Sequence, residues 1–199
     1  MRRLLVGVAA LALTTVLGGC ASDGGIGKVV NRTLESVGIK DANEEPREQR
    51  VPLRLYAGEN LNAGNGKRAL AAVVKVYHLR GSNRFEQAPF DAFLDADSER
   101  AALGDDLVAV SEIVLTPGAR HEIEERMEAQ AEVLGIVALF RAPASNRWRL
   151  AFDARHKKIE KEGVTIGLHA CAMTTSSESL VSRIAGDPSS LASVKCMSP

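Results

Sequence analysis

The amino-acid sequence predicts a mainly β protein, a β-sandwich of about seven to eight strands with a short helical insertion and an extra amino-terminal helix. Two observations lead to this prediction. From residue 51 onward, apolar and polar residues alternate with the two-residue period of half-buried strands. These segments are short and closely spaced, as in sandwiches, and one longer segment among them has helical spacing instead.

Residues 1–19 are predicted to be a lipoprotein signal peptide. Two arginines precede an apolar run of about 14 residues, which is shorter than the roughly 20 that a membrane-spanning helix needs. The run ends in Leu-Gly-Gly-Cys at residues 17–20, which is typical of a bacterial lipobox, whose cysteine is acylated and becomes the first mature residue. We therefore expect Cys20 to be acylated. The alternative is an ordinary secretory signal that happens to contain a cysteine.

The residue after the lipobox indicates which membrane holds the anchor. In enteric bacteria an acidic residue at this position favours retention in the inner membrane, and here the residue is Ala21. We therefore expect an anchor in the outer membrane of a Gram-negative bacterium, with the rest of the chain facing the periplasm. Several acyl chains hold a protein stably on a bilayer, so no transmembrane helix is expected in the mature chain.

Residues 20–50 are expected to connect the acylated cysteine to the folded domain. A small polar tether is followed by apolar residues at helical spacing over residues 26–38, which predicts a short amphipathic helix. Its short apolar stripe favours packing against the domain over lying on the membrane. Without the two arginines of the signal peptide, the 25 acidic residues outnumber the basic ones, so the composition does not indicate nucleic-acid binding.

The β-sandwich domain is expected over residues 51–176, followed by a carboxy-terminal tail over residues 177–199. Its predicted strands lie in the segments 51–57, 71–80, 112–118, 120–130, 132–141, 146–154 and 163–174. The charged segment 120–130 could also be a helix, but the neighbouring turns favour an exposed edge strand. Alternation in segment 146–154 places Trp148, Leu150 and Phe152 inward and the charged residues, Arg147 included, outward.

The segment that breaks the strand rhythm is 82–107. Its aromatic and aliphatic residues recur at irregular helical intervals, which predicts one or two short helices that cap an end of the sandwich. Its many acidic residues lack the ordered spacing of a calcium-binding EF-hand loop. We therefore expect a solvated helix face and not a metal site.

The chemically reactive side chains form no convincing catalytic set. His169 and Cys171 share a face of one strand and could be a nucleophile and its base, or two metal ligands. Cys196 offers another partner, and disulfides persist in an oxidising compartment. We therefore expect a Cys171–Cys196 disulfide, closing a loop of roughly 25 residues and contributing about 3 kcal/mol. Free thiols and a metal or catalytic role are the alternatives; otherwise we expect no enzyme, cofactor or metal.

The connection between the first two predicted strands, residues 58–70, is longer than a two-residue hairpin turn. It combines several asparagines and a basic pair with Leu61, which looks like an exposed apolar anchor. Such a composition is typical of a recognition loop on a rigid scaffold, whereas the alternative is a long hairpin that is merely tolerated.

The lipobox and the segments "VPLRLYAGENLNAGNGKRALAAVVKVYHLR", "FEQAPFDAFL", "LGDDLV", "IVLTPG", "VLGIVALFR", "NRWRLAF" and "GVTIGLHACAMT" occur in this order. Over about residues 51–175 this series resembles the TssJ family of outer-membrane lipoproteins of type VI secretion systems. The resemblance implies a transthyretin-like β-sandwich with an added helical piece. It also implies a role as the outer-membrane anchor of a membrane complex, binding the periplasmic carboxy-terminal part of TssM in a complex that also contains TssL.

In that family the loop between strands one and two contributes to the contact with TssM. The matching residues of this sequence are Glu59, Asn60, Leu61, Asn62, Ala63, Gly64, Asn65, Gly66, Lys67 and Arg68. This chain departs from many relatives after the last loop glycine, where it reads Lys-Arg and not proline.

A function of another class is compatible with the same sequence. A periplasmic lipoprotein sandwich could be a binding module or inhibitor that captures a small ligand or an enzyme. That function predicts a concave apolar pocket with a few convergent polar groups.

Overall fold

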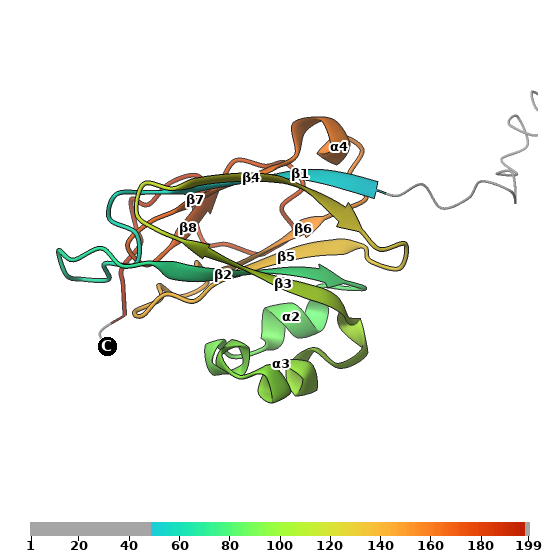
Figure 1. Ribbon diagram of the computed structural model, residues 1–199, viewed down its shortest axis with the longest axis horizontal. Coiled ribbons are helices and arrows are strands. Elements are labelled where there is room, and N and C mark those ends of the chain that lie inside the picture. The colour runs from blue at the N-terminus through green and yellow to red at the C-terminus, as the bar shows by residue number, and fades with distance from the viewer. Residues whose placement is uncertain (1–48, 198–199) are drawn as a thin grey trace, which may run out of the picture. The chain divides into compact units, whose positions relative to one another are not determined.

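The computed structural model describes residues 49–197, which form eight strands in two four-stranded sheets (Figure 1). The strands are β1 Gln49–Ala57, β2 Ala72–Leu79, β3 Leu107–Leu115, β4 Arg120–Met127, β5 Val133–Ala138, β6 Arg149–Asp153, β7 Val164–Leu168 and β8 Met173–Thr175. The helices are α2 Asn83–Gln87, η1 Phe90–Leu94, α3 Ala96–Leu103, η2 Gly104–Asp106 and α4 Ile159–Glu162. The predicted signal peptide, Cys20, the tether and the amphipathic helix lie outside the described residues.

The predicted fold class is confirmed. One sheet has the order β4-β1-β7-β8 and the other β3-β2-β5-β6; the pairing of β1 with β7 is parallel and all other pairs are antiparallel. The last predicted strand segment divides into β7 and β8, because the chain turns between Leu168 and Met173. The charged segment 120–130 contains the edge strand β4, as its alternation predicts.

Aliphatic side chains from both sheets fill the space between them. In β1 every second residue is buried, which is the alternation expected of a strand with one face on a core. The inward residues that are at most 1% exposed include Val51, Leu53, Leu55, Val74, Val76, Leu134, Ile136, Leu150, Val164, Ile166 and Leu168. The sandwich interior is therefore occupied by the protein's own side chains.

The helical insertion lies on the outer face of the second sheet and does not cap an end of the sandwich, so that prediction is wrong. Figure 1 shows α2 and α3 on the side of β2 and β5 that faces away from the first sheet. The ring of Tyr77 on β2 lies 5.5 Å from the ring of Phe85 and 5.8 Å from that of Phe93. Beside Tyr77, Gly135 leaves room for α2, because a Cβ atom there would lie 3.0 Å from Phe85.

A buried ion pair joins the insertion to the same face. Lys75 of β2 is 6% exposed, Glu99 of α3 is 4% exposed, and their Nζ and Oε1 atoms are 3.1 Å apart. The Tyr77 hydroxyl donates a hydrogen bond to the same carboxylate. Burial and this bond to Glu99 raise the pKa of Tyr77, which therefore stays protonated. Because each charge depends on the other, losing either one leaves an unpaired charge out of water.

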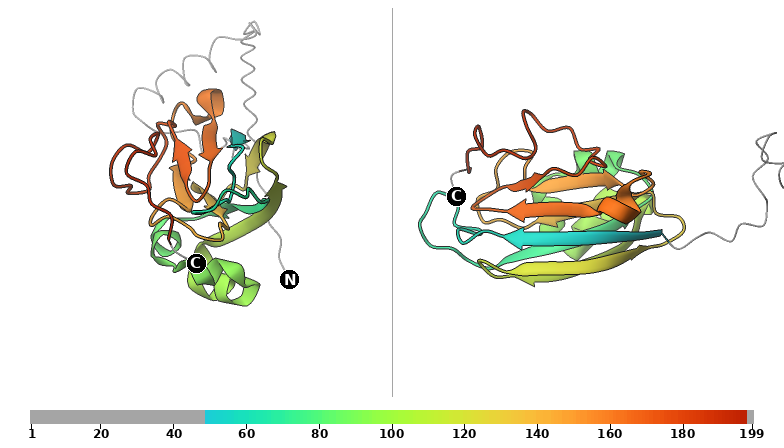
Figure 2. Two further views of the ribbon diagram at one scale, coloured as in Figure 1. Left: turned by 90° about the vertical axis from the view of Figure 1, so that its left-hand side faces the viewer. Right: turned by 90° about the horizontal axis from the view of Figure 1, so that it is seen from above.

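Arg147 is buried, which contradicts its predicted outward position. Its guanidinium donates hydrogen bonds of 2.9 Å to the carbonyl oxygen of Asp187 and 3.2 Å to that of Pro188. The strand alternation fails here because the carboxy-terminal tail, far along the sequence, covers this side of the sandwich (Figure 2). Within residues 49–197 no helix has the length and apolar character needed to cross a membrane.

His78 of β2 links the two sheets through two carboxylates. The stability of the domain should therefore depend on pH. Its Nδ1 lies 2.5 Å from Glu128 and its Nε2 lies 3.3 Å from Glu125. Burial lowers its pKa, but hydrogen bonds to both carboxylates outweigh burial and leave the pKa raised above its ordinary value of 6.5. The ion pairs therefore contribute fully below pH 6.5 while the carboxylates are ionised, and are lost as pH rises through the raised pKa.

We expect the free energy of unfolding to fall as pH rises above 6.5, and His78→Gln to remove that part of the decrease. Urea unfolding of both proteins across this pH range measures it. An equal slope in the two proteins would contradict the assignment to His78.

Candidate partner-binding loop

The loop between β1 and β2 passes from one sheet to the other, so it is not a hairpin. β1 lies in the first sheet and β2 in the second. The connection must span the thickness of the sandwich, which accounts for its length. It lies at the end of the molecule where the described chain terminates (Figure 1).

The backbone of the loop continues beside the segment that follows β7. Hydrogen bonds of 2.8–3.0 Å run from the amides of Gly58, Asn62 and Gly64 to the carbonyl oxygens of Leu168, His169 and Ala170. These bonds continue beyond the parallel pairing of β1 with β7 but do not keep its regular register. The first half of the loop is therefore fixed to the chain at the end of the two inner strands of the first sheet.

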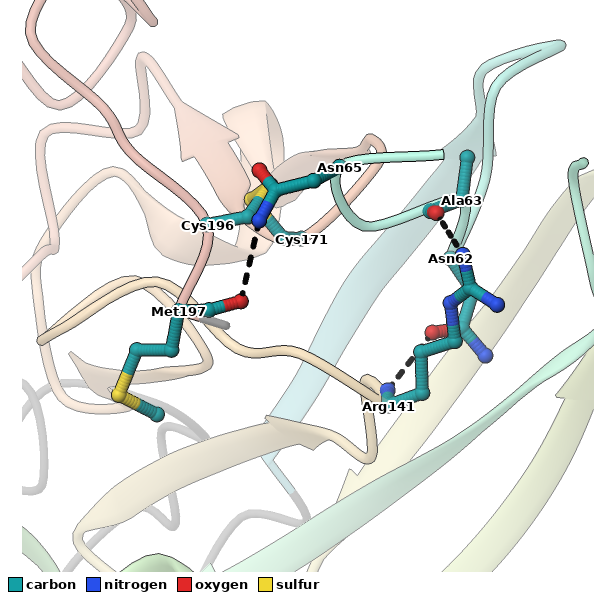
Figure 3. The surroundings of a disulfide bond; sticks show 7 residues. All are labelled: Asn62, Ala63, Asn65, Arg141, Cys171, Cys196 and Met197. Carbon is teal, nitrogen blue, oxygen red and sulfur yellow. Dashed lines mark hydrogen bonds between the residues drawn. A yellow bond between two sulfur atoms is a disulfide. The ribbon is translucent and has the colours of Figure 1, made fainter. Parts of the chain in front are cut away.

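Leu61 is 0% exposed, so the prediction of an exposed apolar anchor is wrong. Asn62, 6% exposed and at φ 53°, fixes the turn beside it. Its side chain donates to the carbonyl of Ala71 at 2.9 Å and accepts from the amide of Arg141 at 2.8 Å (Figure 3). Asparagine adopts this left-handed backbone more readily than most residues. Leu61 and Asn62 are consequently structural supports of the loop.

The loop is exposed at Glu59 and Asn60 and again at its tip, residues 65–68, and the tip is basic. Lys67 and Arg68 are both exposed there. Arg141, on the segment after β5, donates a hydrogen bond from its guanidinium to the carbonyl of Ala63 and so adds a third cation beside the tip. Such a surface favours a partner with negative charge, and the attraction should weaken as salt is added.

The structure joins Cys171 to Cys196 in a disulfide, the pairing expected from the sequence. Figure 3 shows this bond beside the loop, where the Asn65 side chain donates to the carbonyl of Met197 at 3.4 Å. Cys171 therefore has no free thiol to act as a nucleophile or metal ligand. His169 instead lies 3.0 Å from the hydroxyl of Thr174, and burial lowers its pKa.

The sandwich and the loop together match a known family. The family model described as "Type VI secretion lipoprotein, VasD, EvfM, TssJ, VC_A0113" matches residues 49–171, a range that holds β1 to β7 and the whole loop. The chain belongs to this family. The predicted resemblance is thus confirmed.

Solved structures of type VI secretion lipoproteins share the fold of this chain. The T6SS lipoprotein TssJ1 from Pseudomonas aeruginosa is 29% identical, with a TM-score of 0.55 over 70% of this chain and 99% of that one. Lip from Serratia marcescens, a membrane-bound component of the type VI secretion system, is 18% identical, with a TM-score of 0.55 over 64% and 97%. No curated protein matches the sequence.

Two further structures share the fold. A chain of a type VI membrane complex has a TM-score of 0.58 and 24% identity over 65% of this chain and 98% of its own. A chain of a structure described as the carboxy-terminal domain of the T6SS protein TssM from EAEC has a TM-score of 0.53 and 22% identity, over 63% and 96%. Both are similar to this chain in fold.

The family match ends at Cys171, so the tail that carries Cys196 lies beyond it. We expect Cys171→Ser with Cys196→Ser to lower the free energy of unfolding by about 3 kcal/mol, because the unfolded chain gains the freedom of the opened loop. Amide hydrogen exchange over residues 61–66 should also speed up, since the tail no longer holds Asn65. Unchanged urea unfolding and unchanged exchange in the double variant would contradict this role.

Sequence reasoning missed Arg141 as a support of the loop. This arginine directly follows an apolar run and resembles the charged end of a strand. It contacts Asn62 and Ala63, which lie 79 and 78 residues away in the sequence. The local pattern of apolar and polar residues does not indicate such a contact.

Proposed function

We propose that this protein is an outer-membrane-anchored lipoprotein of the type VI secretion membrane complex, tethering that complex by binding the periplasmic carboxy-terminal domain of TssM. Membership of the type VI lipoprotein family, through a match that spans the sandwich and the loop, carries the proposal. In this function the acyl chains on Cys20 hold one end in the outer membrane. The loop Glu59–Arg68 makes contact at the other end, and TssL belongs to the same complex.

The geometry of the loop supports its part in the proposal. Residues 61–64 are buried and bonded to the segment after β7 and to Arg141, so the backbone that carries the exposed tip has little conformational freedom left to lose on binding. The basic side chains of the tip favour an acidic surface on the TssM domain. A rigid loop of this kind positions its partner, which is the task of a tether.

The alternative, capture of a small ligand by the sandwich, receives less support. Its prediction is an apolar pocket, whereas the space between the sheets is filled by fully buried side chains such as Leu53, Val74 and Ile136. The proposal therefore stays with a structural, non-enzymatic role.

Purification from the native envelope tests the proposed assembly. A protein with an affinity tag at its carboxy terminus, extracted in mild detergent, is expected to bring down TssM and TssL. A variant with the tip residues 65–68 replaced by glycine and serine should bring down neither while remaining in the outer-membrane fraction. Recovery of the tagged parent protein without TssM would contradict the proposal, and recovery of TssM with the tip variant would contradict the role given to the tip.

A further inference from the structure

Three of the four edge strands of the sandwich are protected against pairing with another strand. The tail covers β6 through hydrogen bonds from the amide of Val181 to Ala151 at 2.9 Å and from the amide of Asp153 to Ser179 at 2.8 Å. It covers β8 through a bond of 3.0 Å from the amide of Thr175 to Pro188. The third edge, β4, carries charged residues at every second position, which discourages strand pairing.

The fourth edge strand, β3, is neither covered by the tail nor charged at every second position. Within residues 49–197 it pairs only with β2, and its pairing is regular from Ala109 to Leu115; the single register shift lies before Ala109. Val110 is 42% exposed and Val114 is 67% exposed. A long edge with exposed apolar side chains and free backbone groups is a template for an added strand.

The negative charge of Glu112 on this edge favours some pairing strands over others. Val110, Glu112 and Val114 share the outer face; Oε1 of Glu112 lies 3.4 Å from the buried Nζ of Lys75, but its side chain is 59% exposed and so is open to a second cation. A second copy of the chain is disfavoured, because the antiparallel register that places Val110 beside Val114 also places Glu112 opposite Glu112. Like charges directly opposite each other destabilise a strand pair, whereas opposite charges stabilise it.

We propose that β3 is a docking edge for an extended segment of a protein partner, in which a lysine or arginine stands between two apolar residues at alternate positions. The two apolar residues would cover Val110 and Val114, and the cation would face Glu112. This surface is separate from the loop, and the proposal does not depend on the function proposed above.

Two synthetic peptides, Thr-Val-Thr-Lys-Thr-Val-Thr and the same sequence with glutamate for lysine, test the proposal on the mature chain with Cys20→Ser. In NMR titrations we expect both peptides to shift amides of residues 109–115, with the lysine peptide binding about twofold to fivefold more tightly. Glu112→Gln should abolish this preference, while Lys75 keeps its buried partner Glu99. Val114→Lys, at an exposed position, should weaken both peptides and leave the melting temperature unchanged.

Several results would overturn the proposal. These are the absence of shifts over residues 109–115 at millimolar peptide, and an equal preference of the parent and of Glu112→Gln for the lysine peptide. Slow exchange, in the monomeric peptide-free chain, of those β3 amides that point away from β2 would assign the edge to another part of this chain. A concentration-dependent dimer in sedimentation velocity, abolished by Val114→Lys, would assign it to a second copy.

Discussion

Replacing Cys20 with serine is expected to move the protein from the outer-membrane fraction to the soluble periplasm and to abolish type VI secretion. A serine hydroxyl does not replace the thiol that accepts lipid. The variant therefore lacks the several acyl chains that together hold a lipoprotein stably on a bilayer. No helix among residues 49–197 offers a second anchor. The protein should still fold, because the sandwich begins well beyond residue 20. Envelope fractionation and effector release measure the two effects.

Ser22→Ala is the matched control for this variant, since it changes a neighbouring small polar residue and keeps the thiol. It should behave as the parent protein in both assays. Normal effector release by the soluble Cys20→Ser protein would show that the anchor is dispensable and would contradict the tethering function.

Glu99→Gln is expected to lower the free energy of unfolding by about 3 kcal/mol, a large fraction of the stability of a small domain. The substitution keeps the shape of the side chain but leaves the buried ammonium of Lys75 with only the exposed Glu112, 3.4 Å away. Urea unfolding at neutral pH measures the loss.

Two comparisons make this prediction specific. Asp97→Asn on the same helix removes a carboxylate whose side chain is 90% exposed and should change stability by less than about 0.5 kcal/mol. Lys75→Met with Glu99→Leu should recover only part of the loss, because apolar groups of similar volume can replace a buried ion pair but leave the buried Tyr77 hydroxyl without its acceptor. A loss of equal size for Glu99→Gln and Asp97→Asn would contradict the importance of burial.

The strands could be predicted from the sequence because their signal is local. In β1 the alternation of Leu53 and Leu55 with Arg54 identifies both the strand and its buried face. The sequence does not say which sheet each strand joins, since pairing is set by contacts between distant residues. The placement of the helical insertion on an outer face, where Glu99 meets Lys75, was missed for the same reason.

The loop was located correctly in the sequence, but the roles of its residues were only partly predicted. Leu61 and Asn62 look like surface groups by composition, yet both are buried against segments that arrive later in the chain. Arg147 is a second example, because its alternation points outward until the tail supplies the carbonyl groups of Asp187 and Pro188. Burial by segments that are distant in the sequence cannot be predicted from the local pattern of apolar and polar residues.

Calorimetric titration against the periplasmic domain of TssM from the same secretion system tests the central claim most directly. The experiment compares the mature Cys20→Ser chain with two further double variants of it, Lys67→Ala with Arg68→Ala at the loop tip and Lys157→Ala with Lys161→Ala. The second pair removes two exposed charges, one just before α4 and one within it, at the opposite end of the sandwich (Figure 1). The function proposed here predicts binding by the parent and by the α4 variant, and at least tenfold weaker binding, about 1.4 kcal/mol, by the tip variant. Equal binding by all three would place the contact elsewhere on the sandwich, and no binding by the parent would contradict the tethering function itself.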